Sequence, residues 1–209
     1  GWRGVAKRCS LGLPAVVQVP PNATRGHRPF PTMFFLTCPL AVARVSRLEE
    51  IGYIKAFDSL RTEDPEFRQL FEESQESYAA ERAAMPSELQ NLDKTYEGGT
   101  FSCRGGVGGS HRGVKCLHAH YAHGSARGPG SNPIADYITP AIEPLVCSQP
   151  CVKADGDVTP AWRSRIESYH QKISPPTLQN WRNFVVSSST RVCAEPLGQQ
   201  ATNPSLNKQ

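Results

Sequence analysis

The sequence predicts an α+β fold: a small N-terminal hairpin packed with three to four helices, stapled by a Cys/His metal site and followed by an extended C-terminal tail. Three observations lead to it. Short β-branched and aromatic runs alternate with proline-rich turns over residues 1–40. Apolar residues then recur at helical spacing, and beyond about residue 152 the chain is too polar to bury a core of its own. We expect a Cys/His domain at residues 1–150 and a tail at residues 151–209.

The hairpin is expected from two short runs, residues 15–19 and residues 32–37. The first ends at a pair of prolines, and the second ends at Cys38 and the proline that follows it. A two-stranded hairpin alone is marginally stable in water. If the hairpin brings Cys9 close to Cys38, a bound metal would supply the missing stability.

Two helices are expected after the hairpin. The first opens at Pro39 and carries an apolar ladder along one face, with Glu49 and its charged neighbours left for solvent. The ladder comprises Val42, Val45, Leu48, Ile51 and Ile54. The second opens at Asp64, which can cap the helix, with Pro65 in the first helical position. It continues to about Ala84, and both helices read as scaffold.

A thiol and three imidazoles fall within residues 114–123, where a third helix is expected. At about 100° per residue, Cys116, His120 and His123 share one sector, and His118 points the other way. Positions four apart share a helix face, so Cys116 and His120 could bind the same ion. Whether His118 or His123 takes the place of His120 stays open.

Two ligands do not close a metal site, and the other cysteines beside chain-breaking motifs are the best candidates to complete it. The ligand set we expect is therefore Cys9, Cys38, Cys116 and His120. Thiolates and imidazoles suit zinc or another borderline-soft metal, and four protein ligands would make the site structural. The pair Cys147 and Cys151 either adds to a metal site, closes a small loop or consists of unrelated thiols.

A glycine-rich loop at residues 105–109 precedes this helix. Free amides at a helix start favour an anion, which suggests phosphate binding. The loop lacks the Gly-Lys-Ser/Thr ending of a P-loop, and no clear strand precedes it. We expect instead a flexible entry that lets the Cys/His helix turn sharply.

Composition limits the class of protein. The formal net charge is +4 with a pI near 8.7, and no run of five or six basic residues occurs, so nucleic-acid binding is open but not favoured. No stretch of about eighteen apolar residues exists, so no transmembrane helix is expected. The seven cysteines are an odd number spread along the chain. This pattern favours reduced thiols or metal ligands over a disulfide framework.

The motifs together resemble those of a bacterial family called domain of unknown function 501, over about residues 3–138. The motifs that carry the resemblance are Arg8-Cys9 with Gly12 and Pro14, Phe30-Pro31-Thr32, Leu36-Thr37-Cys38-Pro39, Arg47-Leu48-Glu49, Gly105 to Gly109, Lys115-Cys116-Leu117-His118 through His123, and Asn132-Pro133. The family has no assigned reaction, so the resemblance supports the Cys/His site and implies no chemistry. The chain departs from it at Ile134-Ala135, where members continue Val-Gly, and the tail reads as an addition.

The first functional hypothesis is a non-catalytic accessory subunit of a large organellar assembly. The tail would fasten the folded domain to other protein subunits through residues 151–209, with Trp162, Trp181 and Phe184 as anchors. The chain begins at Gly1 rather than Met, which suggests a removed leader. We therefore expect a mitochondrial energy-converting complex, with a plastid or cytoplasmic location as the alternatives.

Other classes stay open. An organellar ribosomal protein is one alternative, in which basic side chains would face phosphate: Arg104, His111, Arg112 and Lys115. A metal-dependent hydrolase is another, which needs an open coordination position and a general base. His118 or His123 could be that base, oriented by Asp136 or Glu97. Redox sensing ranks last; its thiols would be Cys103, Cys116, Cys147 and Cys151.

Overall fold

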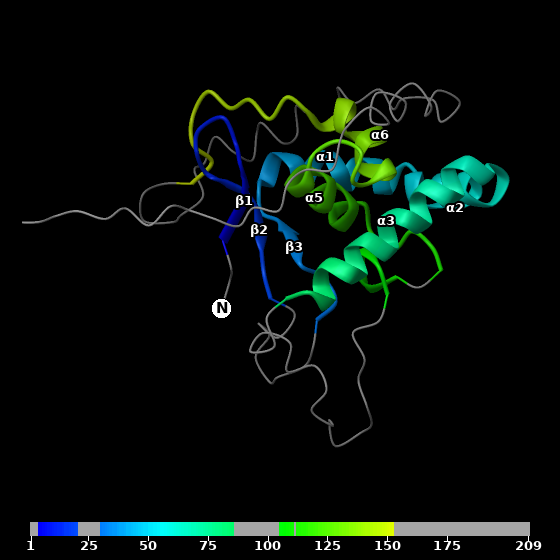
Figure 1. Ribbon diagram of the computed structural model, residues 1–209. Coiled ribbons are helices and arrows are strands. Elements are labelled where there is room, and N and C mark those ends of the chain that lie inside the picture. Colours follow the sequence, from blue (N-terminus) through cyan, green and yellow to red (C-terminus); the bar gives the residue numbers. More distant parts are fainter. Residues whose placement is uncertain (1–3, 21–29, 86–104, 111, 153–209) are drawn as a thin grey trace, which may run out of the picture.

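The computed structural model describes residues 4–20, 30–85, 105–110 and 112–152. Within them the chain forms a three-stranded antiparallel sheet and five α-helices, which confirms the predicted α+β class. The sheet lies at one end of the molecule and the helices fill the rest (Figure 1). The predicted tail lies outside the described residues, apart from positions 151 and 152.

The sheet contains β1 (Gly4–Arg8), β2 (Pro14–Gln18) and β3 (Phe34–Leu36), in the order β1-β2-β3. The predicted hairpin corresponds to β2 and β3, where Val17 lies opposite Phe35. β1 was not predicted as a strand and adds a third, irregular member to the sheet. Val16 and Phe34 are each only 1% exposed, so this small sheet packs its inner face into the core.

The first predicted helix is two helices. α1 (Pro39–Glu50) stops at Ile51, and α2 (Tyr53–Glu63) restarts after Gly52. Gly52 has a φ of 93°, a left-handed conformation that other residues adopt at a cost. The expected apolar ladder is therefore interrupted, and Ile51 is 39% exposed rather than part of the core.

α3 (Pro65–Ala83) begins where the sequence predicts. Asp64 Oδ1 accepts hydrogen bonds from the N–H groups of Glu66 and Phe67, at 3.0 and 3.1 Å. These bonds satisfy two of the backbone donors that a helix start leaves free. The face of α3 that bears Phe67 is buried against the other helices.

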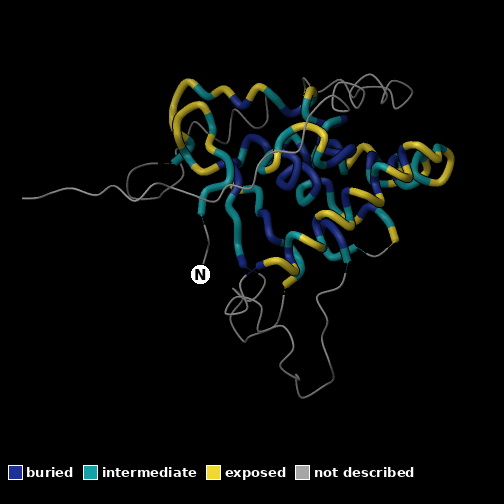
Figure 2. The backbone as a smooth tube through the Cα atoms, viewed as in Figure 1, coloured by how far each residue is buried: buried dark blue, intermediate teal, exposed yellow. Residues whose placement is uncertain are grey.

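α5 (Leu117–Arg127) lies at the centre of the molecule, next to α6 (Pro133–Ile142) and the short 3-10 turn η1 (Val107–Gly109). It passes between α1 and α3, beside the inner face of the sheet (Figure 1). The tube coloured by burial is mostly buried along the middle of α5 and the first part of α6, while α2 and α3 turn an exposed face outward (Figure 2). Residues 120–124 therefore belong to the core of the fold, while Lys115, Cys116 and His118 lie nearer its surface.

The chain after α6 runs back across the helices to the turn between β1 and β2 (Figure 1). The Lys7 Nζ lies 2.5 Å from the Glu143 Oε1, and the Ser10 hydroxyl donates to the Leu145 carbonyl at 3.2 Å. Residues near both ends of the described chain are thus held together. No helix in the described part of the chain has the length and apolar character needed to cross a bilayer.

α5 and α6 approach closely because Gly124 has no side chain. A Cβ at this position would overlap the Ala135 Cβ. We expect Gly124→Ala to destabilise the protein by about 1–3 kcal/mol through overpacking, even though alanine favours helices over glycine by about 1 kcal/mol.

The double variant Gly124→Ala, Ala135→Gly tests this cause, because it restores the missing space. Urea unfolding of both variants should show that the second substitution recovers part of the stability lost by the first. Equal or additive losses would contradict the close-packing explanation.

Candidate metal centre and its pocket

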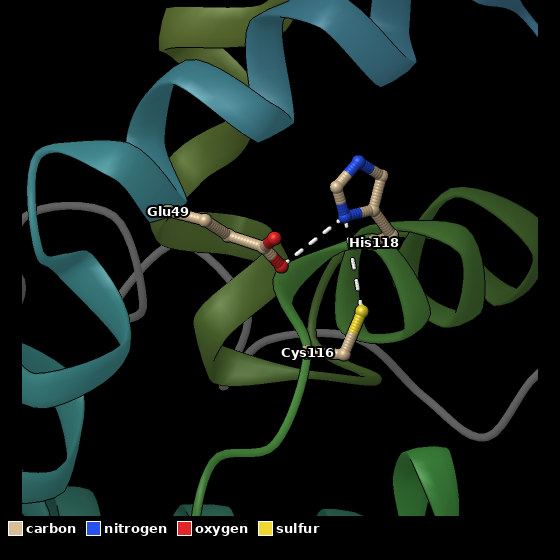
Figure 3. A group of neighbouring side chains, drawn as sticks. All are labelled: Glu49, Cys116 and His118. Carbon is tan, nitrogen blue, oxygen red and sulfur yellow. Dashed lines mark hydrogen bonds and ion pairs between the residues drawn. The ribbon is translucent and has the colours of Figure 1, made fainter.

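Glu49, Cys116 and His118 bring one carboxylate oxygen, one thiol sulfur and one imidazole nitrogen within 4.8 Å of one another (Figure 3). The His118 Nδ1 lies 3.1 Å from the Glu49 Oε1 and 3.7 Å from the Cys116 Sγ. We call these three residues the Glu49 group. Among the residues that the structure describes, no other set of three or more such side chains meets as closely.

The two helices that carry the Glu49 group present it by ordinary helix geometry. Val42, Ser46 and Glu49 lie on one face of α1, since positions four and seven apart share a face. Cys116 precedes the first turn of α5 and is extended, with φ −157° and ψ 119°. The Glu49 Oε1 also accepts the N–H of Leu117 at 2.7 Å, so the carboxylate caps the start of α5.

Both ring nitrogens of His118 face acceptor oxygens. The His118 Nε2 lies 3.3 Å from the Val42 carbonyl oxygen and 3.2 Å from the Ser46 hydroxyl. An imidazolium donates from Nε2 to the Val42 carbonyl and from Nδ1 to the Glu49 carboxylate, since both oxygens only accept. A neutral His118 with its proton on Nδ1 donates to Glu49 and accepts from the Ser46 hydroxyl. With its proton on Nε2 instead, the Nδ1 lone pair faces the Glu49 carboxylate, and a cation would fit between them.

The environment of His118 favours positive charge at this place. Burial lowers the pKa of His118, but the hydrogen bond with Cys116 and the nearby Glu49 carboxylate outweigh it, so the pKa is raised overall. Negative potential from the same partners would also favour a metal cation. The local field therefore fits an imidazolium or a bound ion equally well.

A pocket with a cavity volume of about 320 Å³ opens beside the Glu49 group. We call it the Phe30 pocket. Its lining is Phe30, Thr32, Phe34, Phe35, Leu36, Gly108, Lys115, Cys116, His118 and Ala119. Two of the three group members thus face this space, which lies where β3 meets the start of α5.

The structure does not bring the four predicted ligands together. Cys38 precedes α1 and Glu49 lies near its end, so at 1.5 Å per residue they are about 16 Å apart. Cys116 belongs to the Glu49 group at the far end of α1, away from Cys38. Cys116 and His120 do not share a face either, because Cys116 precedes the helix and is extended. Metal binding by Cys9, Cys38 and His120 stays a prediction.

Cys38 has other thiols for neighbours. Cys9 and Cys147 both pack against the apolar cluster that contains Cys38. Burial raises the pKa of the Cys38 thiol, and the nearby Cys147 and Cys9 raise it further, against the lowering effect of two helix N–H groups. The prediction that Cys9 lies near Cys38 is thus supported, and Cys9 and Cys38 are both free thiols.

His120 and His123 are buried and uncharged. The Asn132 amide lies within 3.2 Å of the Nδ1 atoms of both, and each imidazole stacks on a phenylalanine, His120 on Phe71 and His123 on Phe34. Burial lowers the pKa of His120 to about 4 and that of His123 to about 3. Neither lines the Phe30 pocket, so His123 is not placed as the general base expected of it.

The glycine-rich loop uses its amides within the protein. The N–H groups of Gly106, Gly109 and Ser110 bond to loop carbonyls, and that of Val107 bonds to the Gln75 side chain at 2.8 Å. These four donors are not available to a phosphate. The expected flexible entry is instead a turn held by hydrogen bonds.

The remaining predicted residues divide into two sets. Asp136 accepts the N–H of Gly130 at 2.8 Å and so closes the turn before α6. Lys115 lines the Phe30 pocket, while Arg112 lines a separate cavity. The rest lie outside the described residues: Glu97, Cys103, Arg104, His111, Trp162, Trp181 and Phe184.

Glu49 is the member of the group that sequence reasoning assigned to solvent. It follows the buried Leu48, and its charge suggested an exposed face. The available signal was its spacing, because Glu49 lies four residues after the buried Val45. That spacing does not show that Glu49 contacts His118 and the N–H of Leu117 at the start of α5.

Comparison with known proteins identifies the family. The model of the family described as protein of unknown function (DUF501) matches residues 5–139. The chain belongs to this family. No curated protein and no solved structure matches the chain. All three members of the Glu49 group and the whole lining of the Phe30 pocket lie inside the DUF501 region.

The neutral burial of His123 has a consequence for acid stability. The unfolded chain takes up a proton on this residue near pH 6.5, but the folded chain does so only near pH 3. The unfolded state therefore binds more protons in between, and stability falls as the pH falls through that window, by up to about 1.4 kcal/mol per pH unit.

The variant His123→Phe should lose stability less steeply than the original chain between pH 6.5 and 4. A phenyl ring suits the contacts with Phe34 and Tyr78, whose ring centroids lie 5.9 and 5.0 Å away. Urea unfolding of both proteins at several pH values measures the two slopes. Parallel slopes would mean that His123 is not buried uncharged.

Proposed function

We propose that the Glu49 group binds a zinc-type divalent ion and that the ion serves a hydrolytic reaction on a small molecule held in the Phe30 pocket. The observation that carries this proposal is that Cys116 and His118 line that pocket. Three protein ligands beside an accessible space are typical of catalytic zinc, whereas structural zinc is closed by four. Of the functions predicted from the sequence, the metal-dependent hydrolase therefore has the most support.

The donor set suits such an ion. Zinc binds thiolate, imidazole nitrogen and carboxylate oxygen, and the Glu49 group offers one of each. With its proton on Nε2, His118 would donate to the Val42 carbonyl and leave Nδ1 to bind the ion. Backbone carbonyls commonly orient metal-binding histidines in this way and increase their basicity.

A zinc ion at this place would polarise a substrate oxygen and lower the pKa of a bound water. The residues around the ion would hold the ligand side chains in place. Ser46 and Val42 hold the plane of the His118 ring, and the start of α5 holds Cys116 at the mouth of the pocket. The apolar side chains of the pocket exclude water around a substrate, which strengthens electrostatic interactions at the reacting bond.

The accessory-subunit role stays a prediction, together with the mitochondrial location and the ribosomal alternative. This role depends on the aromatic anchors Trp162, Trp181 and Phe184, which lie outside the described residues. The role is compatible with a metal centre in the DUF501 region. A subunit that only fastens to neighbours would, however, have no use for a pocket beside its metal ligands.

The metal-binding part is tested by zinc content. Purified protein should carry about one zinc per chain, and Cys116→Ser and His118→Gln should each lower the zinc affinity at least tenfold, because each removes a ligand. Cys38→Ser is the matched control, since it makes the same Cys-to-Ser change at the other end of α1. Zinc lost from both Cys38→Ser and Cys116→Ser would favour the four ligands predicted from the sequence, and zinc kept by Cys116→Ser would contradict the Glu49 group as the site.

The open coordination position is tested with cobalt in place of zinc. Azide added to the cobalt protein should change its visible absorption spectrum, because a small anion can take the position that faces the pocket. A spectrum that azide does not alter would indicate a closed, structural site and would contradict the hydrolase.

A further inference from the structure

The Phe30 pocket combines an apolar wall with a single cation. Phe30 and Phe35 stack on each other, with ring centroids 5.7 Å apart and planes 24° from parallel. Phe30 is 41% exposed, so part of its ring is open to a ligand in the pocket. The two rings and Leu36 form a surface on which a flat or aliphatic group can pack.

Lys115 is the one charged side chain that lines this pocket besides His118. No aspartate or glutamate lines it, and in the described part of the chain no ion pair involves Lys115. Lys115 is exposed and directly precedes Cys116 in the sequence. A ligand that neutralises this charge would place an anionic group at the end of the pocket where the Glu49 group lies.

We propose that the Phe30 pocket binds a small molecule with an aromatic or short aliphatic body and one carboxylate, with the body on Phe30 and Phe35 and the carboxylate on Lys115. The proposal rests on the proposed function for the reaction, but the recognition needs no metal. The cavity volume of about 320 Å³ is at the lower end of the range for small-molecule sites. That size favours a single ring or short chain over a peptide segment.

Charge and shape together explain why a monocarboxylate fits better than its neutral analogue. The apolar body gains from burial in proportion to the area removed from water. The carboxylate gains an ion pair with Lys115 that a carboxamide of the same shape cannot make. In the solvent-accessible rim of the pocket this pair should contribute a modest preference, of about fivefold in affinity.

The test uses the full chain loaded with zinc, and two probes of matched shape: para-fluorobenzoate and para-fluorobenzamide. Fluorine NMR titration measures the affinity of each. We expect the benzoate to bind about fivefold more tightly, and Lys115→Met to remove that preference while the benzamide affinity is unchanged. Lys55→Met is the control, because it removes an exposed lysine of α2 that does not line the pocket.

Phe30→Ala tests the apolar wall separately. Phe30 is 41% exposed and lies outside the buried core, so its loss should leave the fold intact and weaken both probes to a similar degree. Equal affinity for the two probes, or a benzoate preference that survives Lys115→Met, would overturn the assignment of the carboxylate to Lys115. Binding of both probes that is unaffected by Phe30→Ala would overturn the assignment of the pocket.

Zinc content measured on the same samples separates this inference from the proposed function. Zinc present with no preference for the benzoate would overturn the substrate class and leave the metal centre standing. A preference for the benzoate that depends on Lys115, in protein that takes up no zinc even when zinc is supplied, would support the substrate class and contradict the metal centre.

Discussion

The carboxylate of Glu49 joins two helices that are far apart in the chain. It lies near the end of α1, accepts the N–H of Leu117 at 2.7 Å and contacts the imidazole of His118 at 3.1 Å. Because a helix start carries partial positive charge and free donors, a carboxylate from a neighbouring helix stabilises it. The start of α5 is thereby fixed, and with it the position of every side chain that α5 carries.

The rest of the fold is arranged around that helix. The close contact of Gly124 with Ala135 lets α6 lie against α5, and ring contacts with Phe34 and Phe71 connect α5 to the sheet and to α3. Asn132 partners the Nδ1 atoms of both buried imidazoles and also caps α6, although the Nε2 of His120 is buried without a hydrogen bond to any described residue. Two of the histidines that suggested a metal site are therefore part of the core.

The same arrangement leaves one end of α5 accessible. Cys116 and His118 come before the buried part of the helix, at the edge where β3 ends and the Phe30 pocket opens. The start of α5 thus lies beside the metal-binding side chains, an apolar wall and one cation. Small-molecule sites are commonly formed in this way, where rigid elements meet and a few polar groups face an apolar pocket.

The sequence by itself determined the α+β class, the start of α3 at Asp64, the DUF501 motifs and the importance of the Cys116 region, because local propensity, capping and motif spacing act over a few residues. Only the tertiary structure decided which of these residues meet. Glu49 pairs with His118, and Cys38 is separated from Cys116 by the length of α1. The physical reason is that such distances depend on how helices pack, and helix packing depends on side chains distributed over the whole chain.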